Sequence, residues 1–88
     1  MDTIKFANGA VYNCAFLSTG PISGIMQAHI TLSDVTFVEA AEIFSNTDMI
    51  YEMEWGQYRL VGYTTLLGIS IVNDGVMAVL RGGHDELI

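Results

Sequence analysis

The chain has 88 residues, of which 51% are apolar and 15% are charged, and its ten acidic side chains outnumber three basic ones for a net charge of −7. Average domains are about 45–50% apolar and 25% charged, so apolar side chains are in surplus here. A chain of this length forms one domain and buries only about 60–65% of its unfolded surface. We therefore expect a homo-oligomer or a protein partner to cover the remainder. Three cations cannot form the basic face that nucleic acid binding requires, which excludes that class of partner.

The sequence contains no segment suited to a membrane or to secretion. The longest apolar stretch, residues 66–72, includes Gly68 and Ser70 and falls far short of the ~20 residues that span a bilayer. The first residues lack the basic start and apolar core of a signal peptide. The single cysteine, Cys14, excludes an internal disulfide. We expect a cytoplasmic protein, in the host cell if the gene belongs to a phage.

Turn signals near the N-terminus predict a hairpin followed by a further strand. Asn8-Gly9 is typical of a tight type I′ turn, and such a turn would place Phe6 opposite Val11. Residues 20–24, which combine glycine, proline and serine, are expected to end the returning strand. Polar and apolar residues then alternate over residues 26–32, the pattern of a half-buried strand.

One short helix is predicted over residues 37–45. Thr36 and Glu39 fit a capping box, in which each side chain bonds the backbone amide of the other residue. Phe37 and Phe44 lie two turns apart on the same face. Because a helix this short is unstable alone in water, we expect its Phe37/Phe44 face to pack on the sheet.

A second hairpin is predicted around Gly56-Gln57, which fits a two-residue type II′ loop. Over residues 49–55 before the loop, Met49, Tyr51, Met53 and Trp55 alternate with Ile50, Glu52 and Glu54. The resulting register pairs Trp55 with Tyr58, Met53 with Leu60, and Glu54 with Arg59. Opposite charges and apolar side chains then face each other, as expected of a correct register.

A third hairpin is predicted to turn at Asp74-Gly75, with Ile71 opposite Ala78. Its strands are apolar on both faces, which indicates burial on both sides and cover from a second subunit. The predicted fold is α+β: an antiparallel, hairpin-built sheet of about six or seven strands with one helix packed on it. The single domain covers residues 1–83, and residues 84–88 are expected to form a flexible tail.

Candidate catalytic groups are few. Cys14 lies in an apolar strand, and nothing in the sequence places it beside His29 or His84, so we expect a buried, inert thiol. The run 84–86 offers metal-ligand types, but consecutive residues on a tail rarely make a closed site. We predict a protein that is not an enzyme and holds no metal or cofactor.

The second hairpin carries the predicted binding site. Its aromatic side chains fall on one face, and tyrosine and tryptophan are favoured at interfaces because they bury area while keeping a polar tip in water. Core packing, a protein interface and a platform for stacking a purine ring all remain open interpretations of these aromatic residues. Glu52 and Glu54 are interpreted as a solvated face that pairs with Arg59. The candidate partner- or ligand-binding residues are Tyr51, Glu52, Glu54, Trp55, Tyr58 and Arg59.

Residues 35–46 (VTFVEAAEIFSN) and 51–63 (YEMEWGQYRLVGY) resemble small uncharacterised phage and prophage proteins of gut bacteria. The resemblance includes no catalytic motif and implies a phage-encoded accessory protein that acts by binding. Three functions follow as hypotheses. The first is a non-enzymatic module that binds a host defence protein. The second is an oligomer that sequesters a small nucleotide-type ligand at a subunit junction, and the third is a tail or capsid assembly component.

Overall fold

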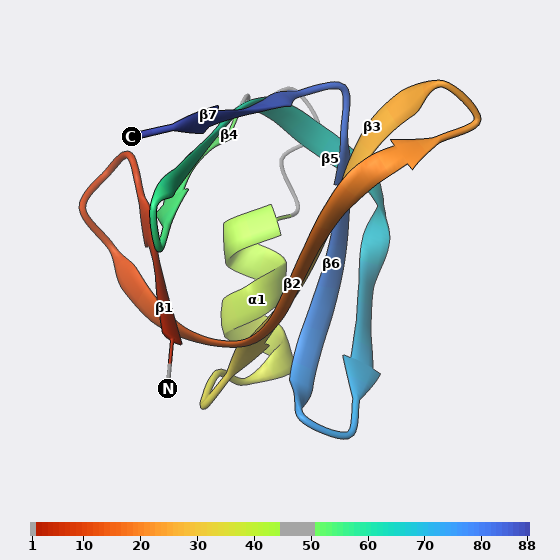
Figure 1. Ribbon diagram of the computed structural model, residues 1–88. Coiled ribbons are helices and arrows are strands. Elements are labelled where there is room, and N and C mark those ends of the chain that lie inside the picture. The colour runs from red at the N-terminus through yellow and green to blue at the C-terminus, as the bar shows by residue number, and fades with distance from the viewer. Residues whose placement is uncertain (1, 45–50) are drawn as a thin grey trace.

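The computed structural model describes residues 2–44 and 51–88, with the side chains of residues 65–68 also outside the description. Its fold is α+β, as predicted: mostly antiparallel sheet with one short helix (Figure 1). The described elements are β1 (Asp2–Phe6), β2 (Val11–Ile22), β3 (Ile25–Ser33), α1 (Phe37–Phe44), β4 (Tyr51–Trp55), β5 (Tyr58–Val72), β6 (Gly75–Arg81) and β7 (His84–Leu87). Within the described residues, no helix is long and apolar enough to cross a membrane.

The sheet closes on itself. The strand order is β4-β1-β2-β3-β6-β5-β7, and an additional pairing joins β4 to β5. All described pairings are antiparallel. β5 is the longest strand; its first half lies between β4 and β7, and its second half pairs with β6. The curved sheet therefore encloses a single interior, and Figure 1 shows α1 within that curve.

The helix begins at the predicted capping box. The Glu39 amide donates to the Thr36 hydroxyl (3.1 Å), and the Thr36 amide donates to the Glu39 carboxylate (3.4 Å). Phe44 is buried, with 2% of its surface exposed, whereas Phe37 is 46% exposed. The prediction that both phenylalanines pack on the sheet is therefore right for Phe44 and wrong for Phe37. Ala40, which is fully buried, contributes the second inward position instead.

The core gathers side chains from every part of the closed sheet except β7. Alternating residues of β3 and β6 point inward, as the period of two along a strand requires. The largest fully buried side chains are Tyr63, Phe44, Ile4, Ile30, Leu32, Met53, Leu60 and Leu80. Enclosure by its own strands lets a chain of this size bury large side chains completely.

The second hairpin has the predicted register. Trp55 pairs with Tyr58, and Glu54 pairs with Arg59. Gly56, at φ 57°, begins the two-residue loop, and Gln57 does not share its positive φ, as a type II′ turn requires. The predicted start of this strand at residues 49–50 lies outside the described residues.

The register predicted for the first hairpin is wrong by one residue. Val11 lies opposite Lys5 rather than opposite Phe6. The loop contains three residues, 7–9, and the Gly9 amide donates to the Phe6 carbonyl (2.9 Å). Gly9 has φ 90°, so it occupies the left-handed position that follows a type I turn in three-residue hairpin loops. Asn-Gly sequences fit both loop types, and the longer loop shifts the pairing.

The register predicted for the third hairpin is wrong by two residues. The turn lies at Asn73-Asp74 instead of Asp74-Gly75, and Ile71 faces Val76 instead of Ala78. A two-residue shift preserves the face to which each side chain points. Val76, Ala78 and Leu80 therefore share one buried face of β6 although their partners differ from the prediction, whereas Ile71 on β5 is 74% exposed and does not show the predicted burial.

Gly75 does not lie in the turn itself but is required by the close packing of β6 against β3. Its φ is 152°, and a Cβ atom at this position would collide with the backbone carbonyl of Leu32 on β3. The start of β6 thus approaches β3 more closely than any side chain allows. This requirement explains why a glycine follows the turn.

The β2–β3 hairpin is longer than predicted and projects from the body of the molecule (Figure 1). β2 continues through Gly20-Pro21 and ends at Ile22, so residues 20–24 do end the strand, but only with the turn at Ser23-Gly24. β1 pairs with β2 only as far as Cys14, which leaves the later residues of β2 on a free edge. Proline is tolerated on such an edge because its missing N–H is not needed there.

Residues 84–88 are not a separate tail, contrary to the sequence-based prediction. β7 pairs with β5 from Tyr58↔Leu87 to Val61↔His84. The Asp85 carboxylate accepts hydrogen bonds from the Thr19 hydroxyl (2.5 Å) and the Tyr63 hydroxyl (2.7 Å). One acidic side chain thus joins β7 to β2 and to the centre of β5.

Candidate binding cavity

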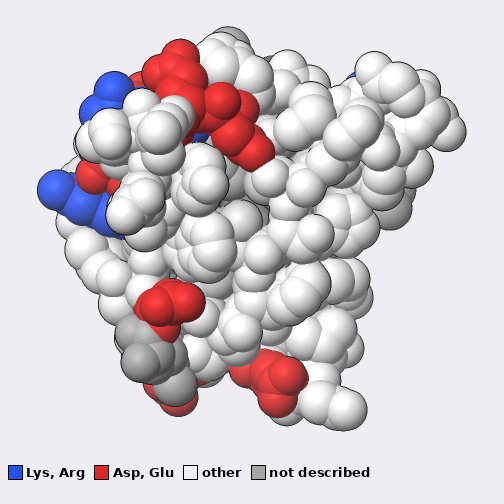
Figure 2. All heavy atoms as spheres, viewed as in Figure 1, with Lys and Arg blue, Asp and Glu red and all other residues white. Residues whose placement is uncertain are grey.

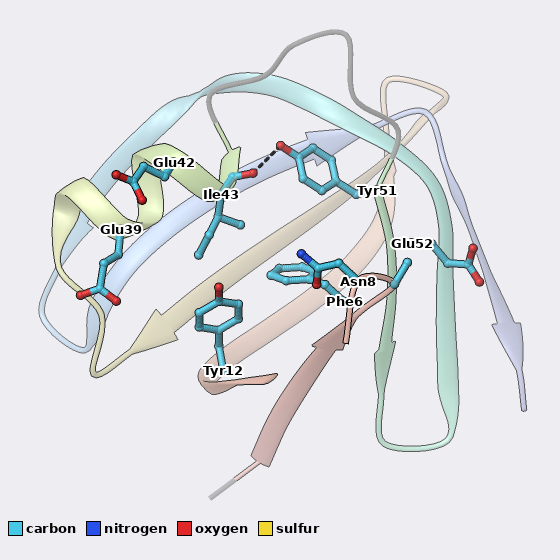
Figure 3. Close-up of a pocket in the computed structure, with 9 residues that line it drawn as sticks. Phe6, Asn8, Tyr12, Glu39, Glu42, Ile43, Tyr51 and Glu52 are labelled. Atoms are coloured by element: carbon cyan, nitrogen blue, oxygen red, sulfur yellow. Dashed lines mark hydrogen bonds between the residues drawn. The ribbon is translucent and has the colours of Figure 1, made fainter. Parts of the chain in front are cut away.

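An open cavity of about 430 Å³ lies where α1, the β1–β2 turn and β4 meet (Figure 3). Ligand pockets in proteins typically occupy about 300–1,000 Å³. The cavity is lined by Phe6, Ala7, Asn8, Tyr12, Glu39, Glu42, Ile43, Tyr51 and Glu52. Segments that are far apart in the sequence therefore build one site, and each is held by backbone pairing or by the core.

The floor of the cavity is aromatic. The Phe6 ring lies 5.5 Å from the Tyr12 ring and 6.5 Å from the Tyr51 ring, measured between centroids. Phe44 packs behind them, 5.9 Å from Phe6 and edge-on to it. Phe6 and Tyr51 are buried, while Tyr12 is only partly covered. Contacts among these rings hold them in place, so the floor is formed before any ligand arrives.

Hydrogen bonds fix two parts of the wall. The Tyr51 hydroxyl donates to the carbonyl of Ile43 (2.7 Å), one of the last carbonyls of α1 (Figure 3). Such carbonyls have no partner within the helix, so this bond satisfies one of them and ties α1 to β4. The Asn8 side-chain carbonyl accepts from the Ala10 amide (2.9 Å), which orients the Asn8 amide group within the β1–β2 turn.

Carboxylates line the helix side of the cavity. Glu39 and Glu42 are one turn apart on α1 and both are exposed. One Glu39 oxygen is engaged by the capping box. In the part of the chain that the structure describes, Glu42 has no hydrogen bond or ion pair. Two acidic groups at this spacing repel each other, and no described cation lies close enough to neutralise either of them.

The candidate residues Glu52, Glu54 and Arg59 belong mainly to the outer face of the sheet. The Arg59 guanidinium lies 3.5 Å from the Glu52 carboxylate and 3.2 Å from the Glu54 carboxylate. Glu52 lies at the cavity rim, but Figure 3 shows its carboxylate pointing away from the aromatic floor. The row Lys5, Glu54, Arg59, Glu86 alternates in sign across β1, β4, β5 and β7. This face is thus neutralised internally, as the interpretation of a solvated face predicts.

The projecting β2–β3 hairpin is the least charged part of the surface in view. Figure 2 shows most of the basic and several acidic side chains at the end formed by β4, β5 and β7, and further acidic side chains toward the opposite end, while the β2–β3 hairpin is almost free of charge. Ile22 and Ile25 face each other at the tip of that hairpin and are about half exposed. Self-association, which the surplus of apolar residues predicts, stays a prediction, and this tip is its candidate contact.

Trp55 and Tyr58 lie away from the cavity, at the other end of the second hairpin. They border a smaller hollow of about 230 Å³ together with Leu17, Thr19, Leu60 and Asp85. Trp55 is partly buried and Tyr58 is 46% exposed. The six predicted site residues therefore do not form one site: Tyr51 and Glu52 line the cavity, Trp55 and Tyr58 line the hollow, and Glu54 and Arg59 pair on the outer face.

The remaining candidate groups do not assemble into a reactive centre. The buried Cys14 thiol donates to the Phe16 carbonyl (3.2 Å), and burial raises the pKa of Cys14, which keeps the thiol protonated at neutral pH. The His84 ring contacts Glu86 at 2.8 Å on the exposed side of β7, whereas Asp85 points to the opposite side. Among the described residues, no group of three or more histidine, cysteine or acidic side chains is placed to hold a metal ion.

Sequence reasoning missed most of the cavity lining. Phe6, Tyr12, Glu39, Glu42 and Ile43 come from two hairpin strands and a helix whose mutual packing no local pattern specifies. Glu39 and Glu42 lie on the side of the helix opposite the predicted Phe37/Phe44 face, where charged residues are usual and give no signal of a cavity. The one available signal was an aromatic residue on each strand flanking the Asn-Gly turn, which the incorrect register obscured.

Comparison with protein-family models, with curated proteins and with solved structures finds no match to this chain. The candidate function therefore rests on the geometry described above.

Proposed function

We propose that this chain is a non-enzymatic binding module, encoded by a phage, that acts by holding a host protein at the cavity beside α1. The observation that carries the proposal is the pre-formed aromatic floor of an open cavity, with Tyr12 partly exposed within it. Tyrosine rings at protein interfaces bury a large area while their hydroxyl groups remain able to bond the partner or water. The floor is ordered by ring contacts, so binding loses little side-chain entropy.

Two features explain why the cavity, rather than the second hairpin, is the proposed contact. On the outer face of that hairpin, Glu52 and Glu54 are already paired with Arg59, and exposed ion pairs of this kind contribute little to affinity. Tyr51 is buried and bonded to α1, which makes it part of the support for the floor. The acidic helix side of the cavity also gives it a chemical preference that the uncharged hairpin tip lacks.

Two tyrosine variants test the proposal. Tyr12→Ala removes the partly exposed ring of the cavity, and Tyr58→Ala removes a comparable ring outside its lining, at the end of the second hairpin. Host proteins retained by the immobilised wild-type protein are purified, and their affinities are measured by calorimetry after circular dichroism has shown that both variants are folded. We expect Tyr12→Ala to cost about 2 kcal/mol, roughly 30-fold in Kd, and Tyr58→Ala to change Kd less than about threefold.

The reverse result, with loss of binding only in Tyr58→Ala, would move the site to the second hairpin. Equal binding by all three proteins, or no host protein that binds the purified wild type, would reject the proposal.

The nucleotide-sequestering hypothesis has less support from the charges. A bound phosphate would need Arg59 or Arg81; Arg59 already contacts Glu52 and Glu54, neither arginine lines the cavity, and the cavity itself presents carboxylates to any anion. No observation on the described residues favours the virion-assembly hypothesis over the other two.

A further inference from the structure

We propose that the group seated in the cavity is the guanidinium of an arginine side chain presented by the protein partner. This inference rests on the proposed function and specifies the chemistry of the same site. It joins three observations: aromatic rings at the floor, carboxylates on the helix side, and an open cavity of about 430 Å³.

The aromatic floor favours a flat cation. A guanidinium is planar, is weakly hydrated and stacks on the faces of aromatic rings, and it is attracted to their negative faces. Tyr12 is the most accessible ring of the floor, because Phe6 and Tyr51 are largely covered by their neighbours. Figure 3 shows the Tyr12 hydroxyl directed toward the space below Ile43. In the described part of the chain that hydroxyl has no hydrogen-bond partner, so it can accept an N–H from the guest.

The helix carboxylates supply the opposite charge. Glu42 has no partner within the described residues, and only one oxygen of Glu39 is used by the cap. Both groups repel each other until a cation lies between or beside them, so a cationic guest gains attraction and removes a repulsion. Arginine suits this arrangement better than lysine because its fork of N–H donors can bond a carboxylate with two parallel hydrogen bonds.

The charge of the whole molecule acts in the same direction. Acidic groups exceed basic ones by seven, and Arg59 is already paired with glutamates. An acidic surface attracts a basic segment before contact and repels anionic competitors. The cavity is therefore the place where overall charge and local shape favour the same ligand.

The test compares arginine with citrulline, its uncharged and nearly isosteric analogue, at the centre of otherwise identical neutral pentapeptides. Each peptide is titrated into the full-length ¹⁵N-labelled protein, and amide shifts report both the site and the Kd. We expect the arginine peptide to shift amides of the β1–β2 turn and of α1, and to bind at least tenfold more tightly than the citrulline peptide. Raising the salt concentration from 20 to 300 mM should weaken the arginine peptide alone, because salt screens exposed charges.

A pair of charge-matched variants localises the effect. Glu42→Gln removes one carboxylate from the cavity while keeping a good helix former, and Asp74→Asn removes one from the β5–β6 turn, outside the lining. We expect Kd for the arginine peptide to rise about fivefold or more in Glu42→Gln and to stay within twofold in Asp74→Asn.

Three results would overturn the inference. They are equal binding of the two peptides, equal losses in the two variants, and tighter binding of free spermidine than of the arginine peptide, since the last would point to a small amine rather than a protein side chain. If Tyr12→Ala abolishes binding of the host protein while the two peptides bind alike, the proposed function stands and the arginine assignment fails.

Discussion

Two phenylalanines on one short helix offer a direct test of how the sheet stabilises the fold. Phe44 is 2% exposed and packs at 5.9 Å from the Phe6 ring and 5.6 Å from the Tyr51 ring, whereas Phe37 is 46% exposed. Truncating a buried phenylalanine to alanine costs about 3–5 kcal/mol, through lost transfer free energy and the cavity left behind. We expect this cost for Phe44→Ala and less than about 1 kcal/mol for Phe37→Ala.

The costs are measured by urea unfolding followed by circular dichroism. Domains of this kind have about 5–15 kcal/mol of total stability, so Phe44→Ala consumes a large part of it, and Phe44→Leu serves as a milder variant should the alanine variant fail to fold. Each kcal/mol corresponds to about 4–8 °C in Tm for a domain of this size. Similar losses at the two positions would refute the inference that Phe44, and not Phe37, packs the helix against the sheet, and so would a cost below about 1 kcal/mol for Phe44→Ala.

Two further predictions concern Tyr63, at the centre of the sheet, and Gly75, where β6 lies close to the backbone of β3. Burial first, and then the hydrogen bond to Asp85 and its charge, raise the pKa of Tyr63 above its usual value, so the native state holds this proton more tightly than the unfolded state. Stability should therefore fall as pH rises above about 10, and in Tyr63→Phe, measured by unfolding at several pH values, this fall should be shallower; an unchanged alkaline loss would contradict the assignment. Gly75→Ala should destabilise by several kcal/mol because its Cβ atom collides with the Leu32 carbonyl, whereas Gly24→Ala, in the open turn at the tip of the β2–β3 hairpin, should cost about 1 kcal/mol; equal costs in denaturant would indicate that β6 can shift away from β3.

The sequence predicted a hairpin register correctly where the pairing of side chains across the hairpin could be used to test it. Glu54 and Arg59 determined the register of the second hairpin, because a slip of one residue would place charged side chains opposite apolar ones. No pair of opposite charges across the hairpin was available to test the registers predicted from Asn8-Gly9 and Asp74-Gly75. At Asn8-Gly9 the sequence fits loops of two and of three residues. At Asp74-Gly75 the glycine is required because a Cβ atom would collide with β3, and this long-range contact cannot be read from the local sequence.

The cavity was the least predictable feature for the same physical reason. Tyr12 and Glu42 are separated in sequence by most of β2, all of β3 and the first part of α1, and they meet only because the sheet closes and encloses α1. Hairpin signals specify neighbours along the chain, while the docking of one hairpin on another depends on side-chain shape throughout the core. β7 was missed likewise, because backbone pairing with β5 and the hydrogen bonds of a single aspartate hold it in place, and neither leaves an apolar pattern in the sequence.

The pairing of β1 with β4 has a consequence for how the chain reaches this structure during synthesis. Lys5 pairs with Glu54, so β1 leaves the ribosome about 50 residues before its second neighbour, β4, exists. Until then, one edge of β1 is open to any extended polypeptide nearby, and long-range pairings of this kind form slowly. Closing the sheet is thus also the step that removes an aggregation-prone edge from the newly made protein, and a delay in translation between β3 and β4 would prolong that exposure.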